Sequence, residues 1–172
     1  VNAQQDGDEI LKLKQVFSKL ESFFHGKSSG LDPLICYLNL PVLIQSKTKL
    51  DTVGLPTPND NGKGAIFLMD SGTTGQTQNM VSIFLEKCKN EGFRNLIKHQ
   101  FKKYNDECIH AFLNKDFKPL MSSIKHLSQL VYDNFSPMIP DNYKHLWKEG
   151  IESNSYYLKL CGSGGGGYIL GF

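Results

Sequence analysis

The chain has 172 residues, of which 40% are hydrophobic and 21% are charged, and its net charge is +2. This length and composition are those of a globular protein with a real core and exclude a disordered or fibrous chain. The balance of 19 basic and 17 acidic residues indicates no nucleic-acid partner. No apolar run approaches the ~18 residues of a membrane span, and no signal peptide is visible. We therefore expect a soluble, cytoplasmic protein with no membrane partner.

The four cysteines have no CxxC spacing and lie in apolar or helical contexts; they are Cys36, Cys88, Cys108 and Cys161. This pattern is typical of free buried thiols in a reducing compartment. The chain begins at Val1 without a methionine and ends at Phe172 in a strand-like stretch. We therefore expect a fragment of a longer protein.

The first third of the chain predicts two helices followed by short strands. Apolar residues recur every three or four positions over residues 8–24, which predicts one core-facing side of an amphipathic helix. These residues are Ile10, Leu13, Phe17, Leu20 and Phe24. Gly26 is a natural stop, and Asp32-Pro33 can open a short helix that ends at Leu38. Residues 41–45 predict a strand, and a second short strand is expected at 50–53 within a turn-rich stretch.

After residue 63 the pattern predicts one strand, four helices and two final strands. The continuous apolar run at 64–70 is typical of a buried strand. Helices are predicted from Thr77 to Cys88, at 93–112, at 117–135 and after Pro140, with a break at 136–140. Strands and helices are clustered rather than alternating, so the predicted fold class is α+β.

Residues 162–167 read Gly-Ser-Gly-Gly-Gly-Gly, which is the composition of a flexible, engineered linker. Their neighbours, including Leu158, Leu160, Tyr168 and Ile169, are strand residues, which a linker would not have. The alternative is a turn between paired strands, because glycine permits positive φ and lets another backbone or a phosphate come close. The N–H groups of such a turn can bind an anion or brace another anion-binding loop.

Three stretches resemble motifs of the GHMP kinases, most closely those of mevalonate kinase-like members. KLCGSGGGGYILGF at 159–172 resembles the C-terminal glycine-rich motif of the family. ESFFHGKSSGLDP at 21–33 resembles its Glu-x-x-x-His-Gly-x-Pro-Ser-Gly-x-Asp-Asn stretch, with the same spacing from Glu21 to Asp32. MDSGTTGQTQNMV at 69–81 is a weaker match to Thr-Asn-Thr-x-x-Pro-Arg-x-Thr. The motifs follow the order of the family, so the resemblance covers most of the chain.

The resemblance implies ATP-dependent phosphorylation of the hydroxyl of a small-molecule alcohol, mevalonate or a similar one, with Mg²⁺ as the metal. It implies that Asp32 is the catalytic base and Glu21 a Mg²⁺ ligand. Ser29 and Ser71 would lie at the substrate. The residues implied to shape the nucleotide site are Gly162, Ser163, Gly164, Gly165 and Gly166.

The residue types alone favour other interpretations of the two acids. An Asp at position 32 before Pro33 favours a helix N-cap, and a helical Glu21 favours a solvated or salt-bridged side chain. Glu21 also lies at the edge of the apolar stripe, where a carboxylate is costly unless a cation or hydrogen-bond donors meet it. The joint match to the family pattern favours the catalytic roles.

Three departures from the family pattern leave alternatives open. Ser28 stands where the family has Pro, Pro33 stands where it has Asn, and Thr74-Gly75 replaces its Pro-Arg pair. The enzyme could therefore use another alcohol than mevalonate, or resemble the ATP-dependent diphosphomevalonate decarboxylases. A non-catalytic binding or regulatory member of the same fold is the remaining alternative.

The resemblance also implies a division into two parts. Residues 1–63 would be the C-terminal remnant of an N-terminal domain that bears the catalytic Asp, and residues 64–172 a ferredoxin-like GHMP kinase C-terminal domain. The main ATP-phosphate loop of the family and its catalytic lysine have no counterpart in this chain. We therefore expect a missing N-terminal segment of the same protein as a partner and an inactive isolated fragment, with a homodimer left open.

Overall fold

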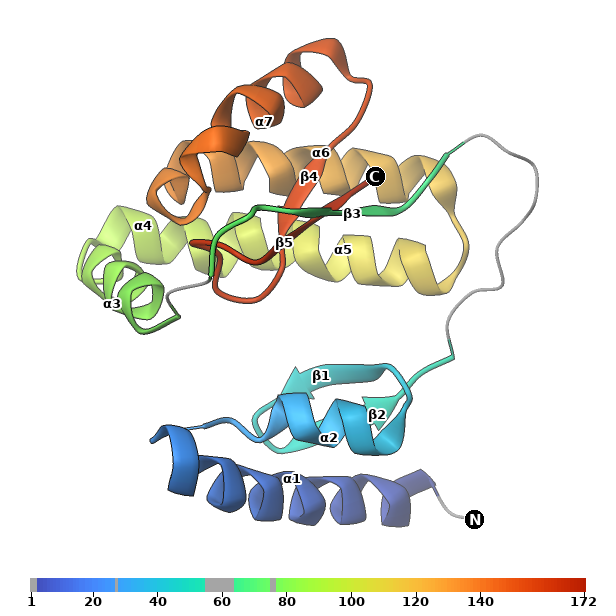
Figure 1. Ribbon diagram of the computed structural model, residues 1–172. Helices are drawn as coiled ribbons and strands as arrows, with labels where there is room; N and C mark the ends of the chain where they lie inside the picture. Colours follow the sequence, from blue (N-terminus) through green and yellow to red (C-terminus); the bar gives the residue numbers. More distant parts are fainter. Residues whose placement is uncertain (1–2, 27, 55–63, 75–76) are drawn as a thin grey trace. The chain divides into compact units, whose positions relative to one another are not determined.

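The structure, a computed structural model, describes residues 3–26, 28–54, 64–74 and 77–172. The chain divides into two compact units, Val1–Thr57 and Pro58–Phe172 (Figure 1). The division falls between Thr57 and Pro58, whereas the sequence predicted it after residue 63. Residues 55–63 lie outside the described residues. Helices combine with small antiparallel sheets, which is compatible with the α+β class.

The first unit contains two helices and a hairpin: α1 (Ala3–His25), α2 (Leu31–Leu38), β1 (Val42–Ser46) and β2 (Lys49–Thr52). The two strands pair in antiparallel fashion, with Ile44 opposite Leu50. Ile10 of α1, Leu34 of α2 and Leu50 of β2 form a small buried core. These elements match the predicted ones, although α1 begins earlier than the periodicity indicated.

Gly30 determines how closely α1 and α2 can pack. It is the N-cap of α2 and has a φ of 72°, which glycine adopts at little cost. A Cβ at this position would lie 2.4 Å from the carbonyl oxygen of Lys14 and 2.5 Å from the backbone nitrogen of Ser18. The start of α2 can therefore rest on the backbone of α1 only because residue 30 has no side chain.

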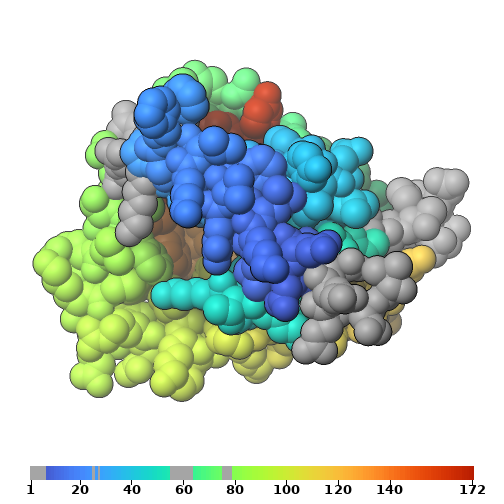
Figure 2. Space-filling model, turned by 90° about the horizontal axis from the view of Figure 1, so that it is seen from below, coloured from blue at the N-terminus to red at the C-terminus, as the bar shows by residue number. Residues whose placement is uncertain are grey.

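The small core of the first unit covers only part of the apolar stripe of α1. Figure 2 looks onto this helix, drawn in dark blue. Leu20 and Phe24 are 57% and 76% exposed, so the prediction that they face the core is wrong. The physical reason is length, because α1 has 23 residues whereas α2 has 8 and the two strands have 5 and 4.

The second unit begins with a strand, continues through helices and ends with two strands. Its elements are β3 (Phe67–Asp70), α3 (Thr77–Lys87), α4 (Glu91–Asn95), the π-helix η1 (Leu96–Phe101), α5 (Lys102–Leu113), α6 (Phe117–Asn134), the 3₁₀ turn η2 (Ser136–Met138), α7 (Asp141–Ser153), β4 (Leu158–Leu160) and β5 (Tyr168–Gly171). The second predicted helix is thus three consecutive helical segments, α4, η1 and α5. Among the described helices, none is long and apolar enough to cross a membrane.

The sheet of the second unit has the order β3-β5-β4, with both pairs antiparallel. The C-terminal strand β5 is therefore central, and Ile169 on it pairs with Met69 on one side and Leu160 on the other. Helices α5 and α6 cover one face of this sheet (Figure 1). The glycine run joins the central strand to the edge strand β4, so its geometry sets the register at the centre of the sheet.

A buried core joins this sheet to the helices. Its members are Met80, Val131, Phe135, Met138, Ile139, Trp147, Leu158 and Ile169. Trp147 of α7 donates its indole N–H to the carbonyl oxygen of Ser128 on α6 at 3.0 Å. This bond satisfies the polar atom of the largest core side chain and pins α7 to α6.

Strand β3 is exposed, against the prediction of a buried strand. Its side chains include Leu68, which is 62% exposed. The described residues give β3 one neighbour, β5, so it lies at an edge. A continuous apolar run is typical of burial on both faces, but an edge strand with helices over one face of its sheet cannot reach that state.

Replacing Gly30 by alanine should destabilise the first unit by about 3 kcal/mol, because the new Cβ would strike backbone atoms that cannot give way. Gly26→Ala is the matched control: its φ is 79°, but nothing lies within 4 Å of the added Cβ. This control should cost about 1 kcal/mol for the left-handed conformation alone. Hydrogen exchange along α1 measures the difference, and equal protection in the two variants would contradict the close packing of Gly30.

Candidate functional site

The two acids of the second motif lie on either side of the turn between α1 and α2. Glu21 is one turn before the end of α1, and Asp32 is the second residue of α2. The half-buried Glu21 carboxylate accepts a hydrogen bond from the Ser28 hydroxyl. That hydroxyl in turn accepts a bond from the Gly30 amide at 3.0 Å. A donor therefore meets the carboxylate, as its position beside apolar residues requires.

Ser28 ties the turn between the helices to α1. Its carbonyl oxygen accepts a hydrogen bond from the Ser18 hydroxyl at 2.7 Å, and its amide donates to the Ser22 hydroxyl at 3.1 Å. Ser28 is also the residue that replaces the proline of the family pattern. The departure therefore supplies the hydroxyl that holds Glu21, together with an N–H that proline lacks.

Asp32 is exposed and is not the N-cap of its helix, because that position belongs to Gly30. The interpretation of Asp32 as a cap is therefore wrong. Its carboxylate lies in the first turn of α2, where it faces the positive end of the helix dipole. The exposed Ser29 accepts a bond from the Leu31 amide through its hydroxyl at 3.3 Å. The catalytic role of Asp32 and the substrate contact of Ser29 stay predictions.

A metal site made only of protein ligands is absent from the described residues, which contain no cluster of three or more His, Cys, Asp or Glu side chains. Mg²⁺ that is bound together with a nucleotide needs fewer protein ligands, because one or two carboxylates, the phosphate oxygens and waters can complete its coordination shell. Ser28 takes one of the two carboxylate oxygens of Glu21. Glu21 therefore fits the role of a single carboxylate ligand of this kind.

The glycine run of the second unit forms a packed turn between β4 and β5. Gly162, Gly164, Gly165 and Gly167 have φ values between 66° and 76°. The Gly165 amide donates to the carbonyl oxygen of Met138 at 2.6 Å, and the Gly167 amide donates to that of Thr73 at 2.7 Å. These bonds argue against a flexible linker.

Side chains are excluded from this turn by close contacts. A Cβ on Gly164 would lie 2.6 Å from the carbonyl oxygen of Met138, and one on Gly165 would lie 2.9 Å from the Met80 side chain. The amides of Gly165 and Gly167 are already bonded within the unit. The turn is therefore better suited to brace a neighbouring loop than to surround an anion with all of its N–H groups.

Ser71 is buried and belongs to the support of the glycine turn. Its amide donates to the carbonyl oxygen of Gly167 at 2.8 Å, and its hydroxyl donates to that of Thr73 at 3.2 Å. Asn142 of α7 donates to the Ser71 carbonyl oxygen at 3.3 Å. These bonds give Ser71 a structural role, and its contact with a substrate stays a prediction. Residues 75–76 of the third motif lie outside the described residues.

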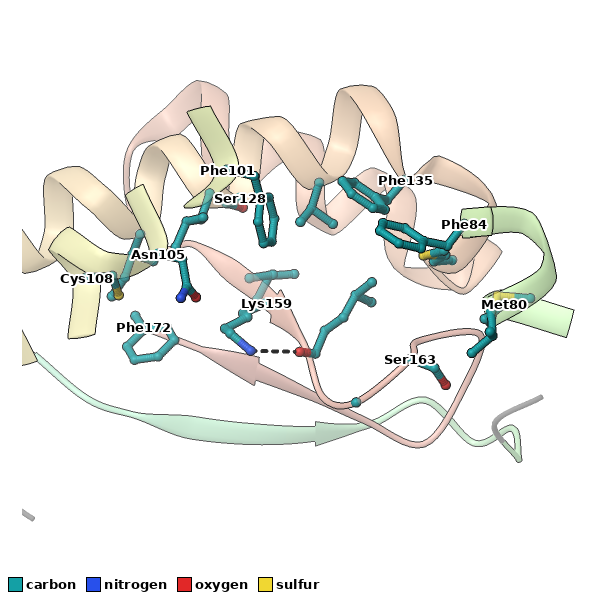
Figure 3. Close-up of a pocket in the computed structure, with 18 residues that line it drawn as sticks. Met80, Phe84, Phe101, Asn105, Cys108, Ser128, Phe135, Lys159, Ser163 and Phe172 are labelled. Atoms are coloured by element: carbon teal, nitrogen blue, oxygen red, sulfur yellow. Dashed lines mark hydrogen bonds between the residues drawn. The ribbon is translucent and has the colours of Figure 1, made fainter. Parts of the chain in front are cut away.

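A pocket of about 300 Å³ in the second unit was not predicted from the sequence (Figure 3). Apolar side chains from α3, η1, α6, η2 and β4 line most of it, together with Phe172, and Gly162 and Ser163 of the glycine turn are also among its lining residues. Its other polar members are Asn105, Cys108, Ser128 and Lys159. The only relevant signal in the sequence was the apolar periodicity of the helices. This periodicity predicts which side chains are buried, but not whether they face other side chains or a cavity.

Comparisons of the chain with family models, curated proteins and solved structures gave no match in any of the three. The relation to the GHMP kinases therefore rests on the three motifs. It stays a prediction, as do the roles that it implies for Glu21, Asp32 and the glycine turn.

Gly164→Ala should destabilise the second unit by about 3 kcal/mol, because its Cβ would collide with a backbone carbonyl oxygen. Gly162→Ala is the matched control, since Gly162 also has positive φ but has nothing within 4 Å of the added Cβ. It should cost about 1 kcal/mol. Urea unfolding followed by Trp147 fluorescence measures both, and equal losses would show that the turn is not packed as described.

Burial raises the pKa of the Cys108 thiol above its ordinary value, and the positive charge of Lys159 lowers it by a smaller amount. Because the thiolate is the reactive form, iodoacetamide at pH 8 should modify Cys108 more slowly than the exposed Cys36. Lys159→Met removes a charge that favours the thiolate, so it should slow the reaction of Cys108 about threefold and leave Cys36 unchanged. Mass spectrometry of each peptide gives the rates; an unchanged or faster Cys108 would refute the pairing.

Proposed function

We propose that this protein transfers the γ-phosphoryl group of ATP to the hydroxyl of a small-molecule alcohol, mevalonate or a similar one. The observation that carries the proposal is the arrangement at the turn between α1 and α2, where Glu21 is held by Ser28 and an exposed Asp32 lies in the first turn of the next helix. Phosphoryl transfer asks a protein mainly for positioning, for metal charge and for one carboxylate that accepts the proton of the nucleophile. The match of residues 21–33 to the family motif, with its spacing from Glu21 to Asp32, supports these roles for the two acids.

In this proposal Asp32 accepts the proton of the attacking hydroxyl, and its exposure leaves it accessible to a substrate. Glu21 supplies one carboxylate oxygen to Mg²⁺, which offsets the charge of the phosphoryl group when ATP is bound. Ser28 holds the Glu21 carboxylate in position. Ser29, three residues before Asp32, offers an exposed side chain for the substrate.

For the second unit by itself, the resemblance implies that the glycine turn helps to shape a nucleotide site. Gly162 is exposed and has nothing within 4 Å of the position of a Cβ, so its backbone leaves room for a phosphate-binding loop to come into contact. The order β3, helices, β4, β5 is the strand–helix–strand–strand order with which a ferredoxin-like fold begins. That order supports the assignment of this unit as a GHMP kinase C-terminal domain. A cytoplasmic location is supported by four free cysteines.

The test is ATP-dependent phosphorylation of mevalonate and a panel of similar alcohols by the protein expressed from its whole gene. Asp32→Asn should lower kcat by at least about 100-fold, because the proton acceptor is lost. Glu21→Gln should raise the Mg²⁺ concentration needed for half-maximal rate by about tenfold. Asp8→Asn and Glu9→Gln, which change two exposed acids near the start of α1, are matched controls that should keep full activity.

Two results would contradict the proposal. Absence of both phosphorylation and Mg·ATP binding in the wild-type protein would exclude a kinase and favour a non-catalytic binding member of the fold. Turnover that is equal in Asp32→Asn and Asp8→Asn would remove Asp32 from the chemistry, whatever the substrate.

A further inference from the structure

The pocket of the second unit contains a buried hydroxyl group that the described protein atoms leave unsatisfied. Ser128 is 1% exposed and lines the pocket, and its Oγ has no hydrogen-bond partner among the described residues (Figure 3). Such an orphaned group is costly, because it has given up water without a replacement. The indole of Trp147 bonds the carbonyl oxygen of the same residue, so this part of α6 is fixed in place. Ser128 therefore lines the pocket with a hydroxyl group that has no hydrogen-bond partner of its own among the described residues.

Further polar side chains line the same pocket, from α5 and from the exposed Lys159 of β4 (Figure 3). Asn105 and Cys108 lie three residues apart on α5 and so share one face of the helix. Lys159 of β4 lies close enough for its charge to act on Cys108. The Lys159 ammonium donates one bond, to the Leu160 carbonyl oxygen at 3.1 Å, and has two further protons to give. A pocket lining that includes an ammonium, an amide and a hydroxyl favours an acceptor, and a negatively charged one in particular.

The remainder of the pocket is apolar. Phe84, Phe101 and Phe135 form one wall, and the ring centroids of the first two lie 6.1 Å and 5.8 Å from that of Phe135. Phe101 ends the π-helix η1, and π-helical segments are rare and frequently occur at functional sites. Apolar walls with a few converging polar groups are the usual composition of a small-molecule site.

We propose that this pocket binds a medium-chain carboxylate, with its head group at Ser128, Asn105 and Lys159 and its chain along the phenylalanine wall. The size of the pocket sets the chain length. If each heavy atom takes about the 30 Å³ that a water occupies in the liquid, about 300 Å³ holds on the order of ten heavy atoms. Octanoate, with eight carbons and two oxygens, is the matching probe. The inference concerns the second unit alone and does not depend on the proposed kinase activity.

An occupant of the pocket would also contact the residues that support the glycine turn. Met80 lines the pocket and packs against the backbone of Gly165, and Gly162 and Ser163 lie at the pocket border. Binding should therefore restrain the turn. The expected sign of this coupling is slower hydrogen exchange of the Gly165 amide when octanoate is present.

The experiment is a titration of the 172-residue chain with octanoate, followed by calorimetry and by the fluorescence of its one tryptophan, Trp147. Saturable binding at one site is expected, about tenfold tighter than that of octan-1-ol, with no binding of acetate. Ser128→Ala should weaken octanoate binding about tenfold, because it removes the hydroxyl donor. Its thermal midpoint should be no lower than that of the wild type, since the lost hydroxyl had no partner.

Matched controls separate this site from general adhesion of a fatty chain. Ser123→Ala changes the other buried serine of α6, which does not line this pocket. It should leave the affinity for octanoate unchanged. Lys159→Met should weaken octanoate binding but not octan-1-ol binding, whereas Lys118→Met should affect neither. The proposal is overturned if the wild-type chain shows no saturable octanoate binding, or if Ser128→Ala and Ser123→Ala bind octanoate equally well.

Discussion

The contact between the Met138 carbonyl oxygen and the backbone of the glycine turn is the constraint on which the second unit depends. This oxygen accepts a hydrogen bond from the Gly165 amide at 2.6 Å. It also lies 2.6 Å from the position that a Cβ on Gly164 would take. No other residue type permits this approach, because positive φ and the missing Cβ are needed together. The turn then sets the entry into β5, the central strand of the sheet, and borders the pocket under α5 and α6. The first unit depends on a similar contact, because Gly30, which has no side chain, lies against the backbone of α1.

These two close approaches also explain why the candidate site residues are placed as they are. Gly30 lets the start of α2, with Asp32 in its first turn, rest on the backbone of α1, while Ser28 connects the turn to the Glu21 carboxylate. In the second unit the hydroxyl of Ser71 is used to hold its own turn, which in turn bonds Gly167. Ser28 and Ser71 thus act first on the conformation of the chain. Their effect on chemistry would come through the carboxylate or the glycine backbone that they position.

The sequence predicted the elements better than it predicted their surroundings. Periodicity located the helices, and the strand-like flanks of the glycine run indicated a turn, because these signals are local. It could not show that Leu20 and Phe24 are exposed, since that depends on how far the shorter α2 and hairpin extend along α1. The edge position of β3, the π-helical stretch before Phe101 and the orphaned Ser128 hydroxyl likewise arise only when distant segments pack. The acids at 21 and 32 were found by motif spacing, whereas the hydroxyl of Ser28 was noticed only as a departure from the motif.

The central claim is that the glycine run is a fixed, hydrogen-bonded turn and not a flexible spacer. Amide hydrogen exchange measured by NMR tests it most directly, because each glycine N–H reports on its own bond. In a fixed turn, the amides of Gly165 and Gly167 should exchange at least about 100-fold more slowly than those of an unstructured glycine. Exchange of both amides at the rate of an unstructured chain would contradict the packed turn, and with it the basis for placing a nucleotide or a pocket border there.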